Sequence, residues 1–158
     1  AFKKDGAITA ANASSINDGA AAFVVVSADF AEKKGIEPLA KIVAHSTASR
    51  EPEWFTVAPA DAMRKLFEKT NLTPDDIDIF EINEAFAVVT LAANKEFDLD
   101  PVKVNVNGGA VAIGHPIGAS GARIFTTLLY AMKQRDAKRG LATLCIGGGE
   151  AVALIVER

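Results

Sequence analysis

The chain is poor in the residues that build disulfides and metal sites. Its 158 residues include one cysteine, Cys145, and two histidines. A single cysteine excludes an internal disulfide framework, which suits a reducing compartment, and we expect a cytoplasmic protein. One cysteine and two histidines supply too few ligands for a structural zinc site, so no metal is expected.

Strong charge of one sign and long apolar runs are also absent. The formal net charge is -3, and the basic stretches "KKDG" and "KQRDAKR" are short and mixed in sign. We interpret them as solvated faces, because nucleic-acid binding needs a basic stripe. No apolar run approaches the roughly 18 residues of a membrane span. Neither a nucleic acid nor a membrane is therefore an expected partner.

The beginning of the chain has neither a methionine nor the charged and then apolar pattern of a signal peptide. The hydrophobic content of 49% suits one compact domain with an attached piece of another. We therefore expect the sequence to be a part of a longer polypeptide.

Hydrophobic patterning predicts alternating strands and helices from Leu39 onward. The short connections between them imply parallel strands joined by right-handed crossovers. The glycine turn at 147–149 predicts that the last two strands form an antiparallel hairpin. The sequence thus predicts an α/β fold with a mixed five-stranded sheet. The expected strands are 39–46, 77–82, 102–106, 141–146 and 151–157, and the expected helices are 59–71, 84–97 and 121–134.

The first 37 residues do not fit that unit. The β-branched apolar run "AAAFVVVSA" (20–28) predicts a buried strand, and "DFAEKKG" predicts a short helix that ends at Gly35. We expect residues 1–37 to be the tail of a preceding unit and residues 38–158 to form the second domain.

Three polar loops follow predicted strands and should meet at one edge of the sheet. They are "NEAF" (83–86), "GHPIGASG" (114–121) and "CIGGG" (145–149). Ligands of open α/β sheets bind outside the carboxyl ends of the strands, where these loops converge. This convergence points to a site more strongly than any one of the motifs.

Each candidate residue also has a plain structural interpretation. His115 could be a surface histidine in a tight turn, although Pro116 restricts it to an extended conformation that aims its ring. Cys145 could be a buried structural thiol, although the glycines that follow it let a ligand approach. Asn83 could be only a helix N-cap, and Ser120 is expected to cap the helix after the glycine loop.

Four segments together resemble the thiolase family of acetyl-CoA acetyltransferases and 3-ketoacyl-CoA thiolases. In chain order they are "NASSINDGAAA" (12–22), "INEAFA" (82–87), "NVNGGAVAIGHPIGASGAR" (105–123) and "GLATLCIGGGEAVALIVE" (140–157). The resemblance runs nearly end to end and implies a thiolase-type layered fold. The chain would be the C-terminal β-α-β-α-β-α-β-β half, preceded by the last strand of the N-terminal half.

The resemblance also implies the reaction and the roles of the site residues. Acetyl-CoA would condense to acetoacetyl-CoA, or 3-ketoacyl-CoA would undergo thiolysis, with the nucleophilic cysteine supplied by the absent N-terminal half. His115 would activate that cysteine, and Asn83 would hold a water of the first oxyanion hole. Cys145 would transfer the α-proton, and the N–H of Gly147 would serve a second oxyanion hole.

Coenzyme A contacts follow from the same resemblance. Ser14 matches a residue that contacts the pantetheine arm, and Ala85 and Phe86 match the apolar lining of its tunnel. Coenzyme A thioesters are expected as substrates, with no permanently bound cofactor. The N-terminal half is the expected partner, within a homodimer or homotetramer.

The sequence departs from the family pattern at three places. Ser15 stands where the family usually has glycine, and it would be strained if that position requires positive φ. Glu150 and Ala151 also differ, and the loop at 50–62 is poorer in glycine. Two other hypotheses remain open. The chain could be a non-catalytic module that binds acyl-CoA or a partner, or one subunit of a two-chain enzyme.

Overall fold

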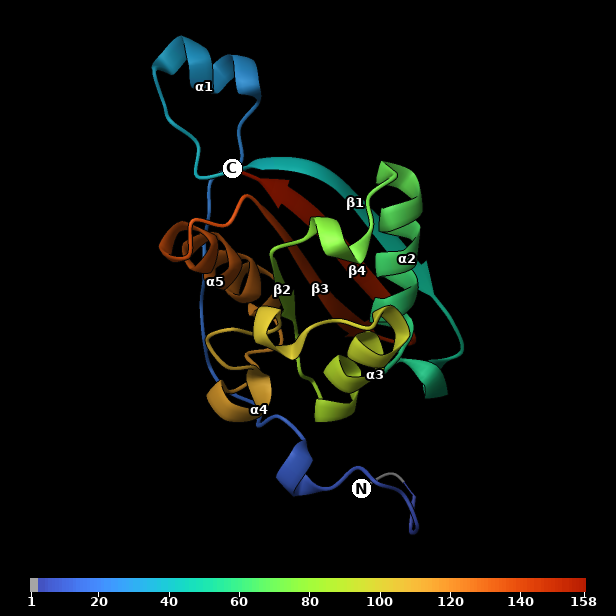
Figure 1. The fold of residues 1–158 in the computed structure, drawn as a ribbon. Helices are drawn as coiled ribbons and strands as arrows, with labels where there is room; N and C mark the ends of the chain where they lie inside the picture. Colours follow the sequence, from blue (N-terminus) through green and yellow to red (C-terminus); the bar gives the residue numbers. More distant parts are fainter. Residues whose placement is uncertain (1–2) are drawn as a thin grey trace.

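A mixed sheet forms the centre of the molecule, of which the computed structural model describes residues 3–158 (Figure 1). Its strand order is β1-β4-β3-β2. β2 and β3 pair in parallel, whereas β4 is antiparallel to both of its neighbours, so β1, β2 and β3 end at the same edge. The strands are β1 (Lys41–Ser49), β2 (Ile79–Ile82), β3 (Arg139–Gly147) and β4 (Glu150–Glu157).

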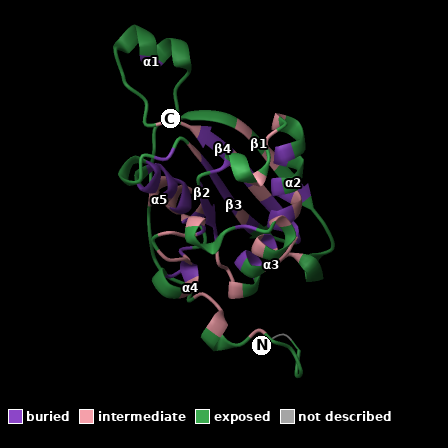
Figure 2. Ribbon diagram, in the orientation of Figure 1, coloured by how far each residue is buried: buried purple, intermediate pink, exposed green. Residues whose placement is uncertain are grey.

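Helices cover both faces of the sheet, which gives the expected layered α/β architecture. One apolar cluster joins α2 (Ala58–Thr70) and α3 (Ala87–Phe97) to one face, and a second joins α5 (Ser120–Gln134) to the other. Figure 2 shows buried residues along the strands and on the helix faces turned toward them. Shorter elements are α1 (Ala28–Lys34), α4 (Ala110–Ile113) and the 3-10 turns Ala10–Asn12, Pro52–Trp54, Pro74–Asp76 and Pro101–Lys103.

The apolar spacing of α5 explains its position. Ile124, Leu128 and Met132 recur every four residues, on one side of the helix, and each is almost fully buried. Burying such a side chain contributes roughly 1.5–3 kcal/mol, so this stripe holds the helix against the sheet. The same helix carries Arg123 beside the stripe, at the edge where the three loops meet.

The expected fifth strand at 102–106 is reduced to a single parallel bridge between Phe80 and Val104. A 3-10 turn begins at Pro101, and Asn105 adopts a φ of 47°, so the backbone cannot continue as a strand. The Asn105 side chain makes the hydrogen bonds to β2 that a fifth strand would have made with its backbone. Its Oδ1 accepts from Ile82 N at 2.8 Å, and its Nδ2 donates to Ile82 O at 2.9 Å. The sheet therefore has four strands, and the prediction of five was wrong.

The strand expected at 20–28 is also not formed, because residues 3–158 provide no neighbouring strand to pair with it. The segment instead crosses the outside of α5, where the rings of Phe23 and Phe125 lie 4.9 Å apart, edge to face (Figure 1). Val24 is 89% exposed. The helix α1 follows and ends at Gly35, whose φ of 62° matches the predicted C-cap.

Candidate active site

The three polar loops meet at the carboxyl edge of the sheet, as the strand order predicted. Asn83 directly follows β2, and its N–H donates to Thr143 O of β3 at 3.0 Å, two residues before Cys145. Its Nδ2 lies 3.4 Å from Nε2 of His115, which comes from the glycine loop. Asn83 is not a helix N-cap, since that position before α3 is held by Phe86.

The hydrogen-bond partners of His115 determine which ring nitrogen carries the proton. Arg123 has only donors, so its Nη2–H donates to Asn83 Oδ1 at 3.2 Å, and the Asn83 Nδ2–H must point at His115 Nε2. On the other side, Ser120 Oγ donates to Pro116 O at 3.0 Å and accepts from His115 Nδ1–H at 2.6 Å. Both ends of the chain of hydrogen bonds therefore leave Nε2 unprotonated.

Electrostatics keeps this imidazole neutral. Burial and the charge of Arg123, in that order, lower the pKa of His115 below its ordinary value. A neutral ring with an unprotonated Nε2 is a proton acceptor, so His115 has the protonation state of a general base.

Ser120 has a different role from the predicted helix cap. Ala119 occupies the N-cap position of α5, and no side chain caps this end of the helix. The Ser120 hydroxyl is fully buried and bonds the imidazole instead. Its position in the first helical turn turns the hydroxyl back toward the preceding loop, where His115 lies within reach.

The backbone around His115 is held by the N-terminal segment. His115 N donates to Ser15 O at 3.0 Å and to Asn17 Oδ1 at 3.2 Å. Gly114 is required next to them, because its φ is 90° and a Cβ would lie 2.2 Å from Asn17 Oδ1. Ser15 is not among the non-glycine residues of positive φ, so the strain considered for it is absent.

Glu84 ties the first loop to the glycine loop. Its Oε2 accepts from Val111 N at 3.1 Å, in the first turn of α4. A Cβ on Gly109 would lie 2.2 Å from the Glu84 carboxylate, which explains why a glycine stands there. This carboxylate therefore fixes the distance between the Asn83 loop and the His115 loop.

Two charged residues beneath the site were missed by the sequence analysis. Arg123 is half-buried, and burial lowers its pKa although the charges of Glu81 and Glu84 oppose this. Glu81 is 2% exposed, and burial, which outweighs the effect of Arg123, raises its pKa to about 7. The available signal was the alternation of β2, which places Glu81 on the same face as the core residue Ile79.

Cys145 and Gly147 lie where β3 passes into the hairpin turn. Cys145 is buried, and desolvation raises the pKa of its thiol, so the proton is held at neutral pH. The strand pairing shifts between Cys145 and Gly147, whose φ is 88°. The space beside Gly147 is open, so a ligand atom can approach its backbone. No hydrogen bond joins Cys145 to His115 within residues 3–158.

The candidate coenzyme A contacts form a second group beside the site. Ser14 N and Ser14 Oγ both donate to Ala85 O, at 3.1 and 2.9 Å. Ala13 forms an antiparallel bridge with Phe86, whose ring lies 5.8 Å from the ring of Phe55 in the loop after β1. The structure thus brings Ser14, Ala85 and Phe86 together.

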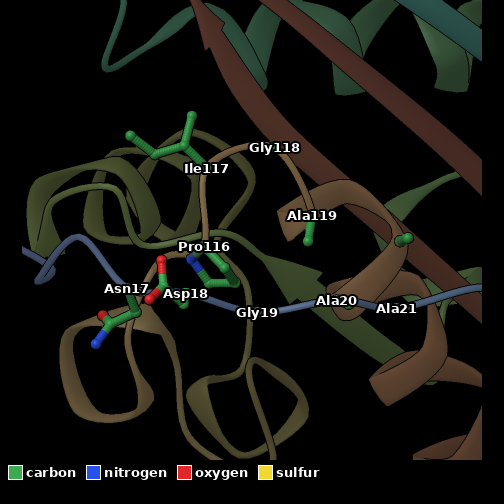
Figure 3. Close-up of a pocket in the computed structure, with 10 residues that line it drawn as sticks. Asn17, Asp18, Gly19, Ala20, Ala21, Pro116, Ile117, Gly118 and Ala119 are labelled. Carbon is green, nitrogen blue, oxygen red and sulfur yellow. The ribbon is translucent and has the colours of Figure 1, made fainter.

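A hollow of about 370 Å³ lies where residues 17–21 cross the glycine loop (Figure 3). Pro116, Ile117, Gly118 and Ala119 form its other wall. None of the candidate residues His115, Asn83 and Cys145 lines it. Within residues 3–158, no group of three acidic, histidine or cysteine side chains could hold a metal ion, and no helix is long and apolar enough to cross a membrane.

Family models match nearly the whole chain. The model described as the thiolase C-terminal domain matches residues 36–158, and the thiolase N-terminal domain matches residues 1–29. The acetyl-CoA acetyltransferases of Allochromatium vinosum and Paracoccus denitrificans are 55% and 54% identical to it. Both alignments cover 100% of this chain and 40% of the relative. The chain thus spans about 40% of the length of these relatives.

Solved structures give the same similarity. The acetyl-CoA acetyltransferase of Bacillus anthracis superposes with a TM-score of 0.95 at 51% identity, over 99% of this chain and 40% of that one. A thiolase from Ascaris suum in complex with coenzyme A gives 0.90 at 47% identity, over 100% of this chain and 41% of that one.

Proposed function

The chain belongs to the thiolase family, and on this premise we propose that it supplies the C-terminal part of an acetyl-CoA C-acetyltransferase site. Residues 1–37 are then the tail of the N-terminal half, and residues 38–158 form the C-terminal domain. The observation that carries the proposal is the neutral His115 ring, whose unprotonated Nε2 lies 3.4 Å from the Asn83 amide. A base and an amide donor converge there on one point at the site edge.

In the acylation step, His115 acts on the nucleophilic cysteine of the N-terminal half. Nε2 accepts the thiol proton while the sulfur attacks the thioester carbonyl, and the thiolate of coenzyme A leaves and takes the proton of the Cys145 thiol. The protonated His115 and a water held by Asn83 donate hydrogen bonds to the carbonyl oxygen. Each such donor contributes about 3 kcal/mol to stabilising the developing charge.

Cys145 transfers the proton of the second step. In condensation the Cys145 thiolate formed in the acylation step removes the α-proton of acetyl-CoA. The carbanion attacks the acyl-cysteine carbonyl, and the cysteine sulfur leaves and takes the proton held by His115. In thiolysis the thiol of Cys145 returns the proton to the carbanion. The raised pKa of the buried thiol suits both directions, since it is protonated at rest and its thiolate is a strong base. The N–H of Gly147 stabilises the second oxyanion.

Coenzyme A thioesters are the proposed substrates, bound beside Ser14, Ala85 and Phe86. The hydroxyl proton of Ser14 is donated to Ala85 O, so Ser14 faces a ligand as an acceptor and suits a pantetheine amide N–H. The thiolase from Ascaris suum, solved with coenzyme A and 47% identical, supports this assignment.

The proposed partner is the N-terminal half, on the same or a separate polypeptide, in a cytoplasmic homodimer or homotetramer. Residues 20–27 support it, because Phe23, Val24 and Val25 form an exposed apolar run that no strand of the described residues adjoins. An added strand would cover this run and give its backbone hydrogen-bond partners.

The proposal is tested by combining this chain with the N-terminal half of a relative and measuring thiolysis of acetoacetyl-CoA. We expect activity only in the combination, and a loss of at least about a hundredfold for His115→Ala. Binding of coenzyme A without any thiolysis by the combination would contradict the catalytic role and support a non-catalytic binding module.

A further inference from the structure

We propose that Glu81 and Arg123 form a buried charge couple that fixes the orientation of the Asn83 amide, which makes both of them positioning residues for His115. This inference rests on the proposed function, because it concerns the same site. It assigns a role to two residues that touch neither the substrate nor the reacting cysteines.

Glu81 occupies a position where the fold would otherwise place an apolar side chain. It lies in β2, where all four residues are buried, and shares the α5 side with Ile79, whose neighbours include Ile124. Its Oε1 has no hydrogen-bond partner among residues 3–158. A buried carboxylate destabilises the fold unless a charge compensates it, so its presence calls for a nearby cation.

Arg123 is that cation. Its Nε is also buried without a hydrogen-bond partner in the described part of the chain, while Nη2 donates to Asn83 Oδ1. The charges that act on Glu81 are those of Arg123 from α5 and Glu84 from the loop after β2. Both carboxylates act on the guanidinium, but Glu84 Oε2 also accepts from Val111 N, whereas Glu81 Oε1 has no hydrogen bond in residues 3–158 that competes with Arg123.

The couple matters because the two ends of an amide have nearly the same shape. Asn83 is 1% exposed, so its orientation is set by its protein neighbours and not by bulk water. A guanidinium has only N–H donors, so when it is held in place the Asn83 amide must turn its oxygen toward it. This orientation places Nδ2 next to His115 Nε2. Without the Glu81 charge, the half-buried guanidinium of Arg123 is held less firmly beside Asn83 Oδ1. Both orientations of the Asn83 amide then become accessible.

A double-mutant cycle in the full native polypeptide tests the couple. Glu81→Gln keeps the shape and removes the charge, and at pH 8, above the pKa of Glu81, we expect kcat to fall about tenfold with KM changed less than about twofold. In an Asn83→Ala background the same change should have almost no further effect, because the couple acts only through Asn83. The control is Thr143→Val, which removes another buried hydrogen bond, from Thr143 Oγ1 to Val152 O, on the adjacent strand.

An equal effect of Glu81→Gln with and without Asn83 would overturn the couple and indicate a purely structural role. If Glu81→Gln does not fold, Arg123→Lys in the same cycle replaces it, since lysine keeps the charge but loses the planar fork. Failure of the proposed function can be told apart from failure of the couple. Either Asn83→Ala would then be as active as the wild type, or the wild type itself would be inactive. If the protein is inactive, the 15N signal of His115 Nε2 tests the couple instead. A signal that stays the same in Glu81→Gln would overturn the couple.

Discussion

The hydroxyl oxygen of Ser120 lies 2.6 Å from Nδ1 of His115, and the hydroxyl donates its own hydrogen bond to Pro116 O. The two lie five positions apart in the chain, with Pro116 between them, so the loop that carries the base also carries the group that sets its tautomer. The glycines of the loop let the N-terminal segment pack directly against it. The loop itself therefore orients the His115 ring, and no cofactor is needed to do so.

Replacing Ser120 with alanine should remove the acceptor for the Nδ1 proton. We expect kcat/KM for thiolysis to fall about tenfold or more, because the ring then samples both tautomers and orientations. The measurement is steady-state thiolysis of acetoacetyl-CoA by the full native polypeptide.

A matched control exists on the same helix. Thr126 Oγ1 donates to Ala122 O at 2.8 Å, so Thr126→Val deletes a helix hydroxyl that is remote from the ring. A loss of the same size in Thr126→Val would mean that Ser120→Ala acts on helix stability and not on His115.

Glu81 should make the stability of the fold depend on pH in a defined window. Burial raises its pKa from the ordinary value of about 4.5 to about 7, so its favourable contribution is complete below about 4.5 and is lost as pH rises through 7. Compared with wild type, Glu81→Gln should therefore gain stability on going from pH 5 to pH 8, by an amount on the order of 3 kcal/mol. Urea unfolding of both proteins at the two pH values measures the difference, and a pH-independent difference would show that Glu81 titrates normally.

Gly109→Ala should damage the contact between the two catalytic loops. A Cβ there would meet the Glu84 carboxylate at 2.2 Å, so Glu84 would have to leave Val111 N. We expect a loss of about 1–3 kcal/mol in the free energy of unfolding, together with reduced activity. Gly118→Ala is the control, since its Cβ position is open and its φ is not positive. Equal stability of the two variants would remove the argument for a spacing role of Glu84.

Much of the fold follows from local patterns in the sequence. The helix α2 begins with Pro59 in its first turn and ends at Asn71 in the left-handed region, both local effects. The meeting of the polar loops at one edge could be predicted because parallel strands order their carboxyl ends together. The family resemblance added the roles of Asn83, His115 and Cys145.

The errors arose where a residue has two possible partners. Ser120 could cap α5 or bond the imidazole, and only the folded loop decides between them. Asn105 looked like part of a strand, but its side chain makes the ladder bonds that a backbone would make. The run at 20–28 has strand composition, yet strand pairing also needs a neighbour. Glu81 and Arg123 are distant in sequence, so no local pattern links them.

The central claim is that His115 rests as a neutral imidazole protonated on Nδ1, with Nε2 ready to accept a proton. The most direct test is the 15N spectrum of the histidine side chains at pH 7.5 in the full native polypeptide. The His115→Gln variant assigns the signals, because those that disappear belong to His115. The account predicts a protonated Nδ1 and a bare Nε2 for His115. A proton on Nε2 would contradict it, because His115 could then not take the proton of the nucleophilic cysteine.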